Sequence, residues 1–242
     1  MSQSELASLR GEPSYVWRAG QERRLGMMAR WAELRDARVL VAGCGVGIYA
    51  GQIRRRYTPK VEAFDIELER ANAARQGIPN ALVAAGESLP YAAGRFDAVL
   101  SHEVIEHVAD DRRCLQEMLR VTKVGGRILL FCPNRWYPFE THGHYWRGQY
   151  RFGNTPLINY LPASLRDKLA PHVRAYTRAE VRRLLRGEAA DVIHHSRIYG
   201  GYDNIIARLG APAVALRDLL YRFEGTALDT WALSHFVVIE KR

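Results

Sequence analysis

The sequence has no hydrophobic run long enough to cross a membrane, and it is poor in cysteine. No window of its 242 residues holds the ~18 consecutive apolar residues that a membrane-spanning helix needs. The first ten residues lack the basic and then apolar pattern of a signal peptide. The three cysteines, Cys44, Cys114 and Cys132, fit neither a disulfide framework nor a zinc site. These absences predict a cytoplasmic protein without a transmembrane segment.

Positive charge is in excess, with a formal net charge of +9. Such an excess attracts anions of many kinds, including nucleic acid, anionic lipid and phosphorylated metabolites. The basic residues are nevertheless spread along the chain in short pieces, such as 54–56 and 182–183, and no long basic arm is present. This distribution favours solvated helix faces over a dedicated nucleic-acid groove.

Segments typical of strands and helices alternate along most of the chain. Short apolar runs predict strands at 38–42, 61–65, 81–85, 96–101, 127–132, 191–199 and 235–240. Helices are expected at 14–35, 47–57, 67–76, 110–122 and 178–187, the last opened by a capping box at Thr177 and Glu180. Gly125 and Gly126 are expected to form the turn before the fifth strand. The alternation predicts one α/β domain whose parallel sheet has helices on both faces.

Two segments interrupt this alternation and are interpreted as cap insertions. Residues 133–176 contain five prolines and a cluster of aromatic residues, namely Trp136, Tyr137, Phe139, Tyr145 and Trp146. The aromatics suit either a lid over a flat or lipid-like small molecule or a miniature core that holds the insertion down. The second insertion, 200–232, contains an amphipathic stretch at 203–223 that is interrupted at Pro212. It is expected to pack on the sheet edge, and a lid, a membrane contact or a homodimer contact are the alternatives.

A glycine-rich loop follows the first predicted strand. Gly43, Gly45 and Gly47 permit a tight turn and a close approach of the backbone to a ligand. Asp65 ends the next strand, where an acidic residue can accept hydrogen bonds from two ribose hydroxyls. Its alternative role is to cap the following helix.

Six motifs then follow in a fixed order, which are 43–47, 64–65, 88–91, 94–99, 102–107 and 123–126. Together they resemble the successive motifs of class I methyltransferases that depend on S-adenosylmethionine (SAM). The resemblance covers residues 35–135 and is greatest to the ubiquinone-biosynthesis type of O-methyltransferase. It implies a Rossmann-like, doubly wound, seven-stranded sheet, mostly parallel with the last strand antiparallel. Residues 1–36 are then an N-terminal helical segment and 37–132 the SAM-binding core.

The resemblance also implies which residues contact the cofactor. Those at the strand ends are Gly43, Cys44, Gly45, Gly47, Asp65, Ile66, Gly86, Glu87 and His102. Arg24 would hold the methionine carboxylate of SAM through a charge-assisted contact, unless it is a solvated helix arginine. Two positions depart from the family pattern, which usually has an acidic residue at Val41 and often an aspartate at Ala85.

A possible metal site lies directly after the fourth strand. Glu103, Glu106 and His107 place two carboxylates and an imidazole close in sequence, which suits a divalent cation such as Mg²⁺. The resemblance implies a later histidine ligand, for which His172 fits best, with His142 and His144 as alternatives. A bound cation would lower the pKa of a substrate hydroxyl. The alternative is that Glu106 orders the loop and no metal is bound.

Without a metal, His107 or a cap histidine such as His144 would be the general base. The sequence therefore predicts methyl transfer from SAM to a small-molecule acceptor, at a hydroxyl oxygen, by in-line displacement. An RNA methyltransferase is a second hypothesis, based on the positive charge and the Glu-Glu-His pattern. A non-catalytic SAM-binding protein is a third, suggested by the missing acid at Val41.

Overall fold

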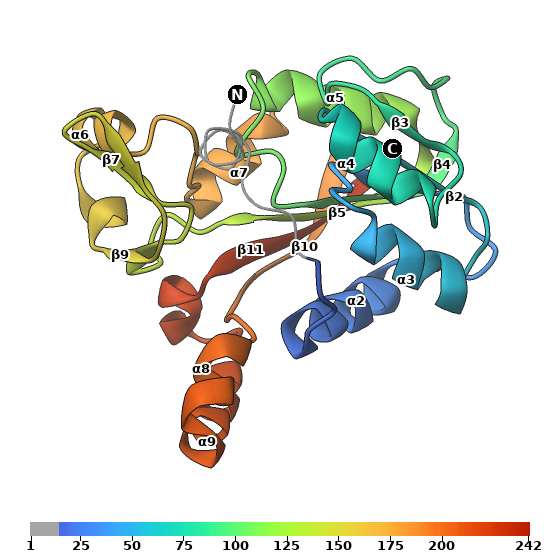
Figure 1. The fold of residues 1–242 in the computed structure, drawn as a ribbon. Coiled ribbons are helices and arrows are strands. Elements are labelled where there is room, and N and C mark those ends of the chain that lie inside the picture. The colour runs from blue at the N-terminus through green and yellow to red at the C-terminus, as the bar shows by residue number, and fades with distance from the viewer. Residues whose placement is uncertain (1–14) are drawn as a thin grey trace.

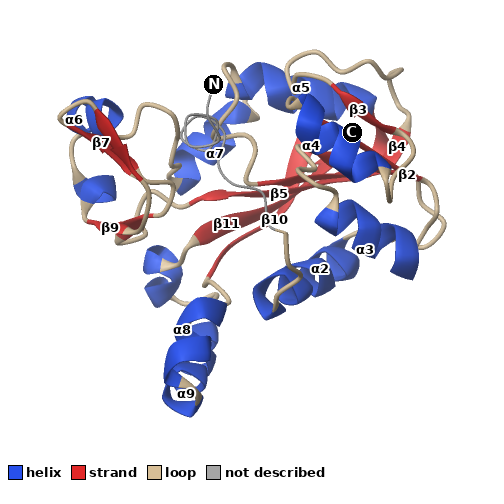
Figure 2. Ribbon diagram, viewed as in Figure 1, coloured by secondary structure: helices blue, strands red, loops and turns tan. Residues whose placement is uncertain are grey.

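The computed structural model describes residues 15–242, which are built around one seven-stranded sheet (Figures 1 and 2). The strand order is β10-β11-β5-β4-β1-β2-β3. The bounds are β1 Val39–Ala42, β2 Val61–Asp65, β3 Ala81–Val83, β4 Phe96–His102, β5 Thr122–Pro133, β10 Ala190–Ile198 and β11 Ser234–Lys241. The last strand, β11, runs antiparallel to both of its neighbours, whereas the other neighbouring pairs are parallel. The predicted Rossmann-like fold class is therefore confirmed.

Helices cover both faces of the sheet and enclose two cores. The helices α2 (Ala19–Trp31), α3 (Ile48–Arg56) and α4 (Leu68–Arg75) supply one core, and α5 (Asp111–Val121) and α7 (Arg178–Leu184) supply the other. Side chains of a strand point alternately to its two faces, so Val39 joins the first core and Leu40 the second. All four residues of β1 are buried, as expected of a central parallel strand.

Several element boundaries differ from those expected from the sequence. The helix α2 is shorter than the predicted 14–35, and residue 14 lies outside the described residues. Gly125 and Gly126 lie within β5 rather than in a turn before it. They form an irregularity, since Phe96 pairs with Thr122 whereas Ala98 already pairs with Arg127. A Cβ atom on Gly126 would lie 2.9 Å from the Asp97 carbonyl oxygen, so this close approach needs glycine.

The first insertion folds into a cap of short elements beside the sheet (Figure 1). Its two small antiparallel sheets pair β6 with β9 and β7 with β8, and helix α6 (Ala163–Leu169) follows. The bounds are β6 Phe139–Glu140, β7 His144–Trp146, β8 Gln149–Arg151 and β9 Thr155–Pro156. The centre of the cap is polar, because Arg166 and Glu140 form an ion pair at 2.9 Å with side chains only 4% and 3% exposed. By contrast, Trp136, Phe139 and Trp146 are 40–49% exposed, so these three do not form a miniature core.

The second insertion forms two consecutive helices, α8 (Asp203–Leu209) and α9 (Ala211–Arg222). They project away from the sheet (Figure 1). The break lies at Gly210, with φ of 63°, and Pro212 belongs to the first turn of α9. No side chain of α8 is buried, and α9 buries only Ala213, so the expected packing on the sheet edge is wrong. Within the described part of the chain, no helix is both long and apolar enough to span a membrane.

Two histidines form a buried pair between β10 and β11. The Nε2 atom of His195 lies 3.0 Å from Nδ1 of His235, whose Nε2 lies 2.8 Å from the Tyr176 carbonyl oxygen. A neutral imidazole has one N–H group, so His235 donates to Tyr176 and accepts from His195. Burial lowers the pKa of His195 to about 3 and that of His235 to about 4. Both rings are therefore neutral in the folded protein.

This pair predicts that the protein loses stability in mild acid. As the pH falls below about 6.5, these two histidines become protonated in the unfolded chain but stay neutral in the folded chain. Protonation therefore favours unfolding. The free energy of unfolding should fall by up to about 1.4 kcal/mol per pH unit for each such histidine, until the pH reaches its folded-state pKa. Urea unfolding between pH 7.5 and 5 measures this slope. His195→Asn should have a shallower slope, and a slope equal to that of the parent protein would contradict the assignment.

Candidate active site

The glycine-rich loop joins β1 to α3 at the carboxyl edge of the sheet. Gly43, Gly45 and Gly47 have φ angles of 57°, 54° and 85°, in the left-handed region that favours glycine. A Cβ atom on Gly43 would lie 2.4 Å from a methyl carbon of Val104, in the segment after β4. The loop therefore presents bare backbone at the edge where ligands of such sheets bind.

Asp65 ties this loop to the end of β2. Its carboxylate is buried and accepts hydrogen bonds from the backbone N–H groups of Gly45, at 2.8 Å, and Glu67, at 3.0 Å. The N-cap of α4 is Glu67 and no side chain caps this helix, so the capping alternative for Asp65 is wrong. The contact with Glu67 closes a turn before α4, while the contact with Gly45 orients the loop. The neighbouring Ile66 is 47% exposed, which leaves an apolar surface beside the carboxylate.

The other predicted cofactor residues of this edge are partly committed to the fold. The Glu87 carboxylate accepts hydrogen bonds from the N–H groups of Ala109 and Asp110, at the start of α5. A Cβ atom on Gly86 would lie 2.7 Å from Sγ of Cys114, so this position needs glycine. Burial raises the pKa of the Cys44 thiol to about 12, which keeps it neutral and unreactive. At Gly86, Glu87 and Cys44, a bound ligand would therefore contact backbone groups more readily than side chains.

Three buried polar atoms near the loop have no hydrogen-bond partner among the described residues. They are Nε of Arg24, the hydroxyl of Tyr49 and Nε2 of His102. The rings of Tyr49 and His102 lie 4.9 Å apart. Burial raises the pKa of Tyr49 to about 12, although the nearby Arg24 acts in the opposite direction. Burial, followed by Arg24, lowers the pKa of His102 to about 4, so the ring is neutral. Buried polar atoms are normally paired, so three such atoms together indicate a place for a polar ligand.

Tyr49 is a residue that sequence reasoning missed. It lies in the first turn of α3 and is 8% exposed, so its pattern is that of an ordinary core position. Its place two residues after Gly47 was the only signal in the sequence.

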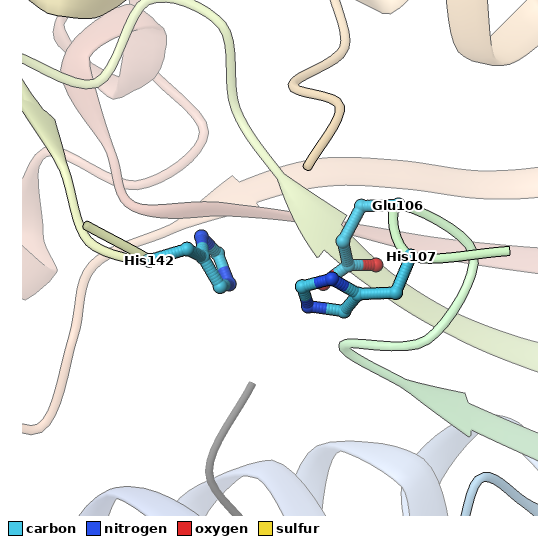
Figure 3. A group of neighbouring side chains, drawn as sticks. All are labelled: Glu106, His107 and His142. Atoms are coloured by element: carbon cyan, nitrogen blue, oxygen red, sulfur yellow. The ribbon is translucent and has the colours of Figure 1, made fainter. Parts of the chain in front are cut away.

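A second polar group lies between the segment after β4 and the cap. Glu106, His107 and His142 each offer a ligand atom, and these atoms lie within 4.8 Å of one another. Figure 3 shows Glu106 and His107 side by side, with the His142 ring approaching from the cap. Glu106 is 1% exposed, and neither of its oxygens has a partner among the described residues.

Glu103 and Glu140 flank His142. Its Nε2 lies 3.7 Å from a Glu103 oxygen, and its Nδ1 lies 3.1 Å from a Glu140 oxygen. Burial disfavours the charged imidazole, but the two carboxylates outweigh it and raise the pKa of His142 to about 10. Burial and the nearby Glu103 charge raise the pKa of Glu106 well above its usual range. The group therefore combines a protonated His142 with a Glu106 whose charged form is disfavoured.

His107 is arranged as a neutral base. Burial, followed by the His142 charge, lowers its pKa to about 4. Its Nδ1 atom lies 3.3 Å from the carbonyl oxygen of His172, which can only accept a hydrogen bond. Nδ1 therefore carries the proton, and Nε2 has a lone pair for a hydroxyl of a bound molecule.

Comparison with known proteins indicates the family. Residues 40–130 match the family model for a methyltransferase domain. This match covers less than half of the chain, and it supports the class I SAM-dependent methyltransferase superfamily. A methyltransferase of uncharacterised function from Mycobacteroides abscessus is 34% identical over 167 residues, which are 60% of this chain and 64% of that protein. Ajmaline N-methyltransferase from Rauvolfia serpentina is 30% identical over 106 residues, 40% of this chain and 36% of that enzyme.

Solved structures support the same fold. The SAM-dependent methyltransferase from Mesorhizobium loti has a TM-score of 0.65 and 18% identity, and the match covers 93% of this chain and 98% of that one. At this identity the likeness shows the fold alone. The chain spans less than two thirds of the length of both curated relatives.

Most of the predicted site residues lie at the carboxyl edge of the sheet or in the segments next to it, but two histidines lie elsewhere. His172 was expected as a metal ligand, yet it is His142 that lies with Glu106 and His107. The Nε2 atom of His172 instead donates to the His142 carbonyl oxygen at 3.1 Å, so His172 supports the cap segment. His144 lies in β7, where Nδ1 is 2.9 Å from the Thr155 hydroxyl, and it is not part of the group either.

Proposed function

We propose that this chain transfers the methyl group of SAM to a hydroxyl oxygen of a small organic molecule, by in-line displacement at the methyl carbon. The observation that carries the proposal is the set of unpaired atoms of Arg24, Tyr49 and His102 beside the glycine-rich loop. A polar ligand held there, at the carboxyl edge of a methyltransferase sheet, fits the amino-acid part of SAM.

Each part of the cofactor has a matching group on this edge. Arg24 would bind the methionine carboxylate through a charge-assisted contact. Asp65 would accept hydrogen bonds from the ribose hydroxyls, and Ile66 would pack against the adenine ring. The backbone from Gly43 to Gly47 would lie against the sulfonium side, with Gly86 and Glu87 offering backbone contacts to adenine.

The acceptor would lie between the segment after β4 and the cap. His107 offers the lone pair of Nε2 as general base, while the protonated His142 stabilises negative charge that develops on oxygen. Phe139 and Trp146 supply exposed aromatic surface in the cap, which suits a flat or lipid-like molecule. Holding both reactants in line can supply roughly 7–11 kcal/mol of barrier lowering.

A divalent cation is a second candidate for activating the hydroxyl. The unpaired oxygens of Glu106, with His107 and His142, form a carboxylate and imidazole set that suits such an ion. A bound cation would supply Lewis acidity toward the acceptor oxygen. His142 would have to lose its proton to bind the ion, whereas the metal-free arrangement of base and positive charge keeps that proton.

His107→Gln is expected to lower kcat about 100-fold, because it removes the general base. The dissociation constant for SAM should stay unchanged, since the Gly43–Gly47 loop and Asp65 are untouched. His144→Gln is the matched control and should keep kcat near the parent value. If His107→Gln keeps full activity, the base assignment is wrong.

The proposed function is tested with SAM that carries a labelled methyl group. Phenols and catechols, amines and total RNA are offered separately, and the products are identified by mass spectrometry. A methyl ether product supports the proposal, an N-methyl product would move the acceptor atom to nitrogen, and labelled RNA would favour the RNA hypothesis. Protein that binds no SAM would overturn the enzymatic assignment. Activity that survives chelator treatment supports His107, and activity restored only by Mg²⁺ supports the cation.

A further inference from the structure

A cavity of about 580 Å³ lies between the cap and the core helices α5 and α7. Its volume falls within the ~300–1,000 Å³ typical of small-molecule sites. Arginines line it from both sides, together with one tryptophan: Arg112, Arg135, Trp136, Arg166, Arg174 and Arg183. The described residues that line it include none of the candidate active-site residues.

Arginines and carboxylates both line the cavity. The carboxylates are Asp111, Asp167 and Glu180. Three of the five arginines have acidic partners, because Arg112 pairs with Glu188, Arg166 with Glu140 and Arg174 with Asp111. Arg135 and Arg183 are therefore the cations that an anion would engage.

Two of the arginines retain donors for a ligand. Arg135 is half-buried and donates through Nη2 to the Leu161 carbonyl oxygen, which leaves Nε and Nη1 without a partner among the described residues. Burial and the neighbouring Arg166 lower the pKa of Arg135, although Asp167, Glu180 and Glu140 act in the opposite direction. Arg183 is exposed on α7, and its guanidinium forms no hydrogen bond or ion pair with the described residues.

We propose that this cavity binds a small organic anion, with a phosphate or carboxylate group on the arginines and a flat apolar part against Trp136. A guanidinium matches either oxyanion in a two-pronged geometry. Trp136 is 42% exposed and stacks on Tyr160 at 6.1 Å, which holds its ring in place at the rim. The site is separate from the methyl-transfer site and does not depend on the proposed function.

The cavity is connected to the active site through residues 174–176. The Arg174 backbone N–H donates to the Glu106 carbonyl oxygen at 3.0 Å, and the Tyr176 hydroxyl donates to the Ile105 carbonyl oxygen at 3.1 Å. Arg174 and Tyr176 also line the cavity. An anion bound between the cap and α7 would therefore also restrict the motion of the segment that carries Glu106.

The test is a titration of the full chain with 1-naphthyl phosphate, 1-naphthoate and inorganic phosphate, followed by heteronuclear NMR and calorimetry. Saturable binding of at least one naphthyl compound, tighter than that of inorganic phosphate, is expected, and the tighter of the two identifies the anionic group. Arg183→Gln should weaken this binding about fivefold, since it removes one charge-assisted contact. Arg182→Gln is the matched control, because Arg182 is an exposed neighbour on the same helix that does not line the cavity.

Three results would overturn the proposal. They are the absence of saturable binding by both naphthyl compounds, equal weakening by Arg182→Gln and Arg183→Gln, and competition by saturating SAM. Equal weakening would mean attraction by the net charge of the protein rather than a site. SAM binding is measured on the same samples, so failure of this site and failure of the proposed methyl transfer are read separately.

Discussion

Asp65→Ala is expected to weaken SAM binding about 1,000-fold, because two ribose hydrogen bonds to a charged group are lost at roughly 1.5–3 kcal/mol each. The same substitution removes the acceptor that orients Gly45, so the loop also loses its link to β2. Isothermal titration calorimetry of the purified variant measures the change. The effect should appear in the dissociation constant for SAM before any acceptor is present.

Two control variants separate the ribose role of Asp65 from its role in holding the Gly45 and Glu67 backbone. Asp65→Asn keeps one acceptor oxygen and should recover part of the affinity. Glu69→Ala removes an exposed carboxylate from the first turn of α4 and should leave affinity unchanged. If Asp65→Ala binds SAM as tightly as the parent protein, its carboxylate serves the fold alone and the cofactor assignment fails.

Arg166→Met is expected to lower the free energy of unfolding by about 3 kcal/mol, because the buried Glu140 carboxylate loses one of its two positive partners and keeps only His142. Arg166 also donates to the Asn159 side chain at 3.2 Å and to the Val173 carbonyl oxygen at 2.9 Å. These contacts link β6, α6 and the chain that returns from the cap. Chemical denaturation monitored by tryptophan fluorescence measures the loss.

The matched control for this prediction is Lys168→Met, an exposed cation on the same helix. It should change stability by less than about 0.5 kcal/mol. The double variant Arg166→Met with Glu140→Leu should regain part of the loss, because no unpaired charge then remains. A single variant as stable as the parent protein would show that the cap is not held by this ion pair.

The sheet and the glycine-rich loop could be predicted from the sequence because their signals are local. Apolar runs such as Val39–Ala42 are buried on both faces, and the glycines follow directly. Asp65 was found because it ends the next strand, which lies beside β1. Parallel neighbours bring such strand ends to one edge whatever the rest of the chain does.

The cap side of the site could not be predicted in the same way. The conformation of the small sheets in the cap decides whether His142, His144 or His172 lies next to Glu106. The separation of these residues in the sequence does not predict that conformation. The resemblance favoured His172, but its ring lies against Tyr145 and Tyr150 in the cap. Tyr49 was missed because burial gives a ligand-facing tyrosine and a core tyrosine the same sequence pattern.

The amphipathic stretch at 203–223 shows a different limit of prediction from sequence. Its apolar spacing correctly indicates helices, but amphipathicity does not state what the apolar side faces. Leu209 and Leu216 are 64% and 56% exposed, so these side chains face outward. Both ends of the stretch are linked to α2. Asp203 accepts a hydrogen bond from the Ala19 backbone N–H at 3.2 Å, and Arg23 lies 3.9 Å from the Tyr221 ring and pairs with Glu224.

The antiparallel strand β11 constrains the order in which this domain can be assembled. It is the last strand in sequence, yet it pairs with β5 on one side and with β10 on the other. β10 is therefore translated before the strand that joins it to the sheet exists. Until β11 is synthesised, β5 and β10 each lack the strand that pairs with them in the folded sheet. The pair of His195 and His235 could not form before then. A truncation before Ser234 would thus remove two strands from the sheet, although it deletes only one from the sequence.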